Sequence, residues 1–279
     1  MKQHYIPRWL LKKWADVNGL LRVHRRTPRG MYTQLKTPAQ VCYHNDGWTL
    51  DLKQPAADKY LVEKKITDEI DTKADKVFQR IDREGISNLT GEDAATITWL
   101  CSSILMRGPI SIELMKTTAQ EKFTTLLAAD SIPKELERLG RNAVEITHRH
   151  FPGLIENIGS IMVGSMSFNS KLIAKLASYQ WMLCDFSRTN IGSIVISDLG
   201  LIISGTSLEA DDSIIALPIS PQKALFFTSS ENIARLRGVG LGYLALATID
   251  QAIGNAREFI IADENANENV LRRKMEARQ

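Results

Sequence analysis

The spacing of hydrophobic residues changes along this chain, and the change limits which folds the chain can adopt. Between residue 56 and about residue 84, apolar side chains recur every three or four positions, which predicts one buried face of a helix. After residue 180 the pattern becomes short apolar runs bounded by turn residues, for example 193–196 and 224–227, which are typical of strands. The sequence therefore predicts a helical middle part followed by a β-rich part.

The first 50 residues differ from both of these parts. Pro7 favours the start of a helix, where its missing N–H costs no hydrogen bond, and Asn18-Gly19 favours its end. A turn signal at 27–30 separates the first two of three extended runs, which lie at residues 20–24, 31–35 and 41–43. We therefore expect a helix followed by a small antiparallel sheet.

The boundaries of the other elements follow from capping and breaking residues. Thr90 followed by Asp93 predicts the start of a helix that ends at Arg107, where Gly108 and Pro109 stop or kink it. Further helices are expected at the C-terminus and at about 110–129, 133–149, 153–178 and 231–255. The expected strands of the closing part are 181–184, 193–196, 200–203, 224–227 and 258–262, with a rigid connector at 217–221.

These patterns predict an α+β protein that is predominantly helical. We expect one integrated domain over residues 1–279, whose two ends meet in one core. Its parts would be a basic α/β N-terminal part (1–50), a helical middle (56–179) and a β-rich closing part with helices (180–279). A chain of this length can bury a substantial core as one domain.

Cysteine content and hydropathy indicate the compartment. Cys42, Cys101 and Cys184 are few, odd in number and widely spaced, which predicts reduced thiols and no cysteine metal site. No signal peptide is expected, because Pro7 and basic residues interrupt any apolar run before Lys13. Since the longest apolar segments also fall short of a membrane span, we expect a soluble cytoplasmic protein without a membrane partner.

Positive charge gathers in the N-terminal part. Residues 1–50 hold nine Lys and Arg against two acidic residues, whereas the rest of the chain holds 26 against 30. A basic part on a mildly acidic body is typical of a surface that binds RNA or DNA, and the candidate contacts are Lys12, Lys13, Arg22, Arg25, Arg26 and Arg29. The alternative is that this basic face pairs internally with the acidic body.

Several segments, taken in order, carry a resemblance to a known family. They are QHYIPRWLLKKWA at the N-terminus, VEKKITDEID, MRGP, VISDLGLII, LPISPQKALFF and IDQAIGNAREFIIA. Together they extend over nearly the whole chain, which resembles domain-of-unknown-function family 4238, a family of bacterial and phage proteins whose activity is not established. The resemblance therefore implies site residues but no reaction.

The positions that the resemblance implies are His4, Pro7, Arg8, Glu63, Glu69, Arg107 and Asp198. Members of the family also look as if they keep a Ser-Asp-Asn-Pro turn. In this chain Ser197-Asp198 is followed by Leu199-Gly200. The shape of that turn, and any activity that depends on it, is therefore open.

His4 and Arg8 lie four residues apart and suit phosphodiester chemistry. A histidine can act as general acid or base near neutral pH, and an arginine can hold a phosphate through two hydrogen bonds. Arg107 ends an apolar helix and would stabilise charge on the reacting phosphate. The alternatives are structural: His4 would cap a helix end, Arg8 would bridge to an acid, and Arg107 would pair with a buried acid.

Asp198 follows an apolar strand, where functional carboxylates are often found, and with Glu63 or Glu69 it would hold Mg²⁺ or Mn²⁺. Glu63 and Glu69 are six residues apart and do not share a face of a straight helix, so they form no metal pair by themselves. Solvated helix charge or an ion pair with Arg107 is the alternative for the glutamates. For Asp198 the alternative is a turn in which the carboxylate bonds its own backbone.

Two other motifs carry less information. The histidines of His148-Arg149-His150 point apart on a helix, so a metal role is not expected. Glycines 238, 240 and 242 lie inside a helical run and lack a phosphate-loop pattern, so close helix packing is expected. The sequence contains no Gly-x-Ser-x-Gly, His-Glu-x-x-His or Cys-x-x-Cys motif.

The leading hypothesis is a nucleic-acid-directed effector, namely a nuclease of a phage-defence or toxin type that cleaves RNA or DNA. The alternative is a non-catalytic binding or regulatory module with a protein partner in a defence or toxin–antitoxin pair. In that case His4, Arg8, Glu63 and Arg107 would form a buried polar network. An enzyme for a small phosphorylated molecule would use the same residues. The sequence leaves the oligomeric state and metal dependence open.

Overall fold

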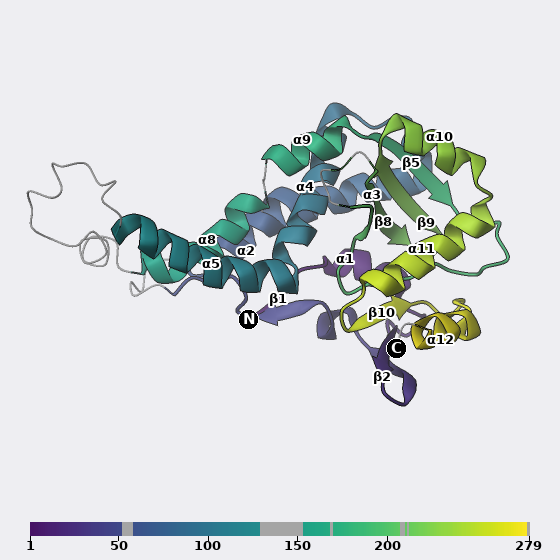
Figure 1. The fold of residues 1–279 in the computed structure, drawn as a ribbon, viewed down its shortest axis with the longest axis horizontal. Coiled ribbons are helices and arrows are strands. Elements are labelled where there is room, and N and C mark those ends of the chain that lie inside the picture. Colours follow the sequence, from purple (N-terminus) through teal and green to yellow (C-terminus); the bar gives the residue numbers. More distant parts are fainter. Residues whose placement is uncertain (52–57, 129–152, 168–169, 207–209, 211, 278–279) are drawn as a thin grey trace, which may run out of the picture.

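The computed structural model describes every residue of the chain except 52–57, 129–152, 168–169, 207–209, 211 and 278–279. The described residues form two four-stranded sheets and one two-stranded sheet, all antiparallel, together with helices (Figure 1). This confirms the predicted α+β class, with a small N-terminal sheet, a helical middle and a C-terminal sheet. The helix predicted at 133–149, and with it His148-Arg149-His150, lies outside the described residues.

The N-terminal part has an additional strand and a shorter helix than predicted. β1 (Lys2–His4), which the sequence did not predict, pairs with β4 (Tyr43–Asn45). Between these strands lie α1 (Arg8–Leu11), a 3-10 turn (Lys12–Trp14), β2 (Leu21–Thr27), β3 (Gly30–Lys36) and a second 3-10 turn (Pro38–Gln40). The helix predicted to reach Asn18 stops at Trp14, because Asp16 accepts the N–H groups of Asn18 and Leu20 and closes a turn there.

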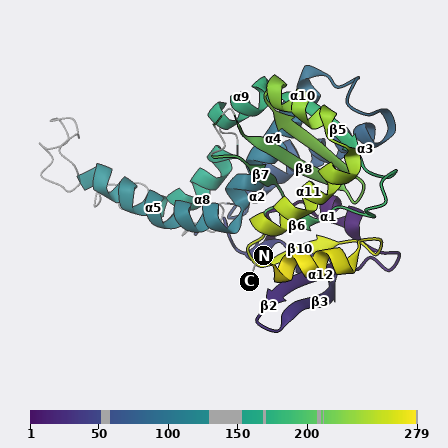
Figure 2. The ribbon, with the colours of Figure 1, turned by 45° about the vertical axis from the view of Figure 1, so that its right-hand side comes forward.

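The first four-stranded sheet joins segments from both ends of the chain. Its order is β3, β2, β10 (Phe259–Ala262) and β6 (Ile196–Ser197), which is shorter than the predicted strand 193–196. β2 pairs with β10 over residues 22–25, so the N-terminal and C-terminal segments share one sheet. The C-terminal helix α12 (Glu268–Glu276) lies against β3, as the turned view in Figure 2 shows.

The second four-stranded sheet follows the order β5 (Gln180–Asp185), β9 (Lys223–Thr228), β8 (Ile214–Ser220) and β7 (Ile202–Ser204). The prediction of a rigid connector at 217–221 is wrong, because Leu217 and Pro218 belong to β8. Proline is tolerated at this place for two reasons. β7 pairs only with residues 214–216, and the pairing of β8 with β9 is irregular between Pro218 and Ser220.

The helical middle consists of α2 (Leu61–Ile66), a π-helical segment (Thr67–Asp71), α3 (Thr72–Glu84), α4 (Gly91–Arg107), α5 (Pro109–Ala128), α8 (Leu154–Met166) and α9 (Ser170–Ser178). The predicted cap of α4 is confirmed, since the Thr90 hydroxyl accepts the N–H of Asp93 and the Asp93 carboxylate accepts the N–H of Thr90. Gly108 ends α4 as predicted. α5 and α8 lie side by side and project from the body (Figures 1 and 2).

The single helix predicted at 231–255 is two helices, α10 (Ser230–Gly238) and α11 (Leu241–Asn255). Val239 and Gly240 adopt extended conformations and separate them. The prediction of close helix packing at the three glycines is wrong. A Cβ added at Gly238, Gly240 or Gly242 would meet no described atom within 4 Å.

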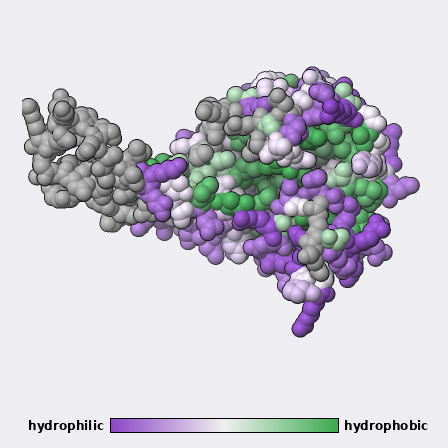
Figure 3. All heavy atoms as spheres, in the orientation of Figure 1, coloured by the Kyte–Doolittle hydropathy of each residue, from purple (hydrophilic) through white to green (hydrophobic). Residues whose placement is uncertain are grey.

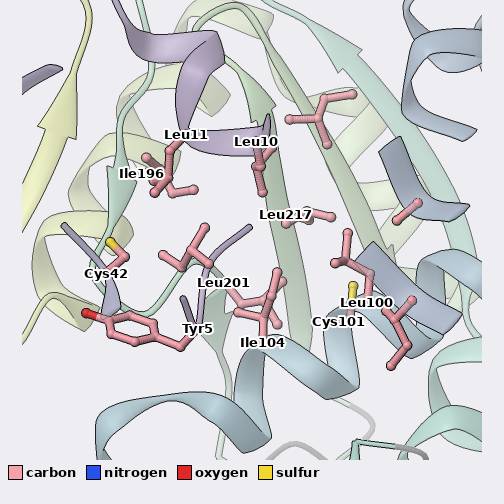
Figure 4. Packing of buried hydrophobic residues seen from close by; sticks show 14 of the residues in the cluster. Tyr5, Leu10, Leu11, Cys42, Leu100, Cys101, Ile104, Ile196, Leu201 and Leu217 are labelled. Carbon is pink, nitrogen blue, oxygen red and sulfur yellow. The ribbon is translucent and has the colours of Figure 1, made fainter. Parts of the chain in front are cut away.

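Two hydrophobic cores lie on the two faces of the second sheet, because alternate residues of a strand point to opposite faces. Leu217 of β8 packs with α1, α3 and α4 in the first core, whereas Ala216 packs with α11 in the second. The opening segment belongs to the first core, where Leu10 and Leu11 are completely buried. Figure 4 shows these two leucines facing Leu201 and Leu217. The opening segment of the chain is therefore held in place by the first core.

The surface of the described residues is divided by hydropathy. Figure 3 shows mostly hydrophilic residues at the lower end of the body, where the β2–β3 hairpin projects, and hydrophobic residues across its middle. Among the described helices, none combines the length and the apolar composition that a transmembrane segment requires.

Candidate functional site

Arg107 is completely buried and makes its contacts inside the protein. Its Nη1 and Nη2 atoms donate to the Asp71 carboxylate over 2.9 and 2.8 Å. Nη1 also donates to the backbone carbonyl of His4 over 3.0 Å. The sequence analysis did not single out Asp71, which lies in the π-helical segment among exposed charges. The structure thus pairs Arg107 with a partly buried acid, in line with the structural alternative.

Glu63 and Glu69 occupy different environments, in agreement with their separate helix faces. Glu63 is half-buried and accepts a hydrogen bond from Nε1 of Trp48 over 2.6 Å. Burial raises the pKa of the Glu63 carboxyl, whereas the nearby Arg107 guanidinium and the Trp48 hydrogen bond lower it. Glu69 is exposed and pairs with Lys73 over 2.9 Å. Glu63 therefore lies beside the Arg107–Asp71 pair, and Glu69 does not belong to it.

His4 joins this network through its backbone and not through its ring. Burial, and secondarily the charge of Arg8, lowers the pKa of the His4 ring to about 4. Its Nε2 atom is buried and has no hydrogen-bond partner among the described residues. Arg8 itself is exposed. The predicted network thus contains Glu63, Arg107 and the carbonyl of His4, while the Arg8 side chain lies outside it.

Asp198 is buried, and its carboxylate holds the loop that leads into β10. Its two oxygens accept the backbone N–H groups of Arg257 over 2.9 Å and Glu258 over 2.7 Å. Burial raises the pKa of the Asp198 carboxyl, and the backbone hydrogen bonds partly oppose this shift. The carboxylate therefore fixes a distant backbone segment, instead of the backbone of its own turn.

The turn after Asp198 has a shape that a proline could not adopt. Gly200 has a φ of +75°, whereas the proline ring restricts φ to about −65°. Its Cα also lies close to the core, because an added Cβ would stand 2.9 Å from Cγ2 of Ile104. With Leu199-Gly200 in place of Asn-Pro, this chain therefore forms a turn that a proline at position 200 could not form.

A cavity of about 640 Å³ lies between the β1–β4 sheet and the outer end of the β3–β2–β10 sheet. Its wall comes from six separate parts of the chain: Tyr5, Arg25, Lys36 with Gln40 to His44, Pro109, Asp198, and Arg257 to Phe259. The volume is within the range of small-ligand sites. This cavity gathers residues that the sequence separates by up to about 250 positions.

Three cationic side chains line the cavity. Arg25 pairs with Glu258 over 3.4 Å, and its guanidinium lies over the ring of Phe259 at 5.3 Å. Lys36 and Arg257 make no ion pair within the part of the chain that the structure describes. The carboxylates of Asp198 and Glu258 also line the cavity, so its charged side chains are three cations and two anions, and Lys36 and Arg257 are the two cations without an ion pair to a described residue.

His44, which the sequence analysis did not single out, is a further titratable group of the cavity wall. Its ring is half-buried, and burial together with the charge of Lys116 lowers its pKa. Its Nε2 atom is buried and has no hydrogen-bond partner among the described residues. A neutral imidazole can act as a general base.

Tyr5 and Cys42 form the inner wall of the cavity. Their side chains hydrogen-bond one another, and Figure 4 shows them next to each other at the edge of the first core. Burial raises the pKa of both groups, so the Tyr5 hydroxyl keeps its proton. Cys42 has a φ of +53°, and such a conformation costs on the order of 1–3 kcal/mol in a non-glycine residue. Backbone strain of this kind is common at functional sites.

The basic residues predicted to bind nucleic acid have mixed surroundings. Lys13 pairs with Asp82, and Arg22 pairs with Glu268 over 3.7 Å, as Arg25 does with Glu258. Part of the basic face thus pairs with the acidic body, which was the alternative interpretation. Lys12 is exposed on the 3-10 turn, and Arg26 and Arg29 belong to the β2–β3 hairpin.

The carboxylates predicted to hold a metal are engaged separately, by Trp48, by Lys73 and by the backbone of residues 257–258. Within the described residues, no group of three or more His, Cys, Asp or Glu side chains is arranged to hold a metal ion. A site for Mg²⁺ or Mn²⁺ made of Glu63, Glu69 and Asp198 is therefore not formed in this structure.

A comparison with protein families shows which family the chain belongs to. The family described as protein of unknown function (DUF4238) matches residues 2–238. The chain belongs to this family. The segments of the DUF4238 resemblance contribute both to the buried network, through Glu63 and Arg107, and to the cavity, through Tyr5, Pro109 and Asp198. No curated protein and no solved structure matches the chain.

Proposed function

We propose that this protein is a nucleic-acid-directed effector whose cavity binds a phosphate of the nucleic-acid backbone. The observation that carries the proposal is the pair of positive side chains, Lys36 and Arg257, that line one cavity and make no ion pair with a described residue. Each backbone phosphate carries one negative charge, and Lys and Arg supply most of the affinity of proteins for nucleic acids. Arg29, which is exposed at the turn of the adjacent β2–β3 hairpin, would extend the binding surface along the strand.

Phosphodiester cleavage is the second candidate function, and His44 favours it. The neutral ring would take a proton from the water or ribose hydroxyl that attacks phosphorus, as the new P–O bond forms and the old P–O bond breaks. The protonated His44 ring, or a water molecule, would then return a proton to the leaving oxygen. This assignment replaces His4 as the proton-handling group and leaves Arg107 a structural role.

Binding is tested by fluorescence anisotropy with labelled single-stranded RNA, single-stranded DNA and duplex DNA. Wild type is compared with Arg257→Glu, and Arg83→Glu is the matched control because Arg83 is exposed on α3, which contributes no residue to the cavity. We expect Arg257→Glu to weaken binding more than Arg83→Glu does. Equal affinities for the two variants would contradict the proposal.

Cleavage is tested on the same substrates with magnesium, with manganese or with a chelator. Wild type and His44→Gln are compared once thermal unfolding has shown that the two proteins are equally stable. Loss of cleavage in His44→Gln with unchanged binding supports the second candidate function. Binding by wild type without cleavage in any lane supports the non-catalytic binding module.

A further inference from the structure

A second hollow of about 580 Å³ adjoins the cavity and shares Lys36, Gln40 and Tyr43 with it. Its other lining residues are Lys2 and residues 32–35 of β3. The two hollows are therefore neighbours, here called together the groove, and the second one follows β3, the edge strand of its sheet. A groove of this kind is longer than one phosphate needs.

One face of the β3–β2 hairpin supplies a row of polar side chains to this groove. Tyr32, Gln34 and Lys36 alternate along β3 and therefore point to the same face. Arg25 of β2 lies directly opposite Tyr32 in the register of the two strands. Towards the middle of the sheet the same face carries Val23, which belongs to the first core. At the hairpin end of this face Tyr32 lies beside Arg25, whereas Lys36 lies at the other end of β3, opposite the buried Leu21.

Two aromatic rings border the groove. The Tyr32 side chain is 52% exposed although it is large and apolar. Tyr43 is half-buried, and the ammonium group of Lys2 lies 4.2 Å from the centre of its ring. Packing leaves the Tyr32 ring open to solvent, and its hydroxyl accepts a hydrogen bond from Nε2 of Gln34 over 3.3 Å.

We infer that the nucleic acid bound by this protein is single-stranded, with an unpaired base stacked on Tyr32 and the adjoining phosphates at Lys36 and Arg257. The inference rests on the proposed function and specifies its substrate class. Aromatic rings beside a cationic groove bind single strands without reading their sequence, because every base has a face that can stack. In a duplex those faces are covered by the neighbouring base pairs.

The test measures the affinity of the full chain for three labelled probes of equal length: oligothymidylate, an abasic strand and a duplex. Tyr32→Ala removes the ring and Tyr32→Phe keeps it. Tyr243→Ala is the control, because Tyr243 is 71% exposed on α11 and lines neither hollow. We expect Tyr32→Ala to weaken binding of oligothymidylate by roughly fivefold or more, as the loss of one stacked base predicts. Binding of the abasic strand stays unchanged, and Tyr32→Phe and Tyr243→Ala behave like wild type.

The failure of this inference and the failure of the proposed function give different results. If Lys36→Glu weakens all three probes while Tyr32→Ala changes none, the phosphate site stands and the single-strand inference is overturned. A preference for duplex that Arg29→Glu abolishes also overturns it, since the hairpin would then act as a ribbon in a groove of the duplex. If Lys36→Glu changes the binding of no probe, the proposed function fails and the inference with it.

Discussion

Arg107 at the end of α4 and Asp71 in the π-helical segment form a two-pronged ion pair in the protein interior, with N–O distances of 2.8 and 2.9 Å. The same guanidinium holds the carbonyl of His4. One arginine thus ties the helical middle to the first strand, and that strand pairs with β4 on the wall of the cavity. The pair positions the cavity without lining it.

Arg107→Met should therefore destabilise the protein strongly. The substitution leaves the Asp71 carboxylate and the His4 carbonyl without their donor, and breaking a buried ion pair costs about 3–5 kcal/mol. Urea unfolding followed by circular dichroism measures the change. Lys73→Met, which breaks the exposed pair with Glu69, is the control and should have a much smaller effect. Equal losses in the two variants would show that Arg107 is not structural.

Asp198→Ala should loosen the loop before β10. Two backbone N–H groups lose their acceptor, and each such hydrogen bond contributes about 0.5–1.5 kcal/mol. Asp198→Asn keeps one acceptor oxygen and should lose less stability. Thermal unfolding of both variants gives the ranking. If Asp198 were instead a metal ligand, adding Mg²⁺ or Mn²⁺ would stabilise wild type but neither variant.

The stability of the protein should fall as the pH is lowered from about 6.5 to about 4, in part because of His4. Burial lowers the pKa of the folded His4 ring to about 4 from 6.5, so over this range the unfolded chain binds a proton that the folded chain does not. Stability is then greatest above 6.5 and declines towards 4. Urea midpoints at several pH values measure the decline, which His4→Gln should make shallower. An unchanged profile in His4→Gln would exclude this contribution.

Gly200→Ala should destabilise the turn that follows Asp198. A positive φ costs about 1–3 kcal/mol in a non-glycine residue. The added Cβ would also stand 2.9 Å from Ile104 and 3.0 Å from Ile6. Gly19→Ala is the control, because Gly19 has a φ of +76° with no described atom within 4 Å of the added Cβ. Thermal unfolding should show a larger loss for Gly200→Ala, and equal losses would mean that the core moves aside.

Local patterns in the sequence predicted the helices and strands where the pattern is strong. The capping pair Thr90 and Asp93 and the break at Gly108 are confirmed, because these signals depend on a few neighbouring residues. The connector predicted from Pro218 and Pro221 is wrong, because the tolerance of a strand for proline depends on where its partner strand ends. Where the partner strand ends depends on the whole sheet, and the sequence of residues 217–221 alone does not show it.

Less of the candidate site than of the fold could be predicted from the sequence. A buried acid was one of two alternatives for Arg107, but Asp71 stands among other charges, and the π-helical segment changes the helical spacing that would have distinguished it. The cavity depends on the pairing of β2 with β10 and of β1 with β4, which brings His44 and Arg257 to one wall. No spacing within the sequence reports such pairings.

The central claim is that the cavity binds backbone phosphates, and the salt dependence of binding tests it most directly. The double variant Lys36→Glu/Arg257→Glu is compared with Lys76→Glu/Arg83→Glu, which changes the net charge equally on the exposed side of α3. For a labelled single strand, we predict that the slope of log affinity against log salt becomes shallower by about 0.7 for each phosphate that the cavity variant no longer neutralises. The α3 variant should keep the wild-type slope. Identical slopes for the two double variants would contradict the claim.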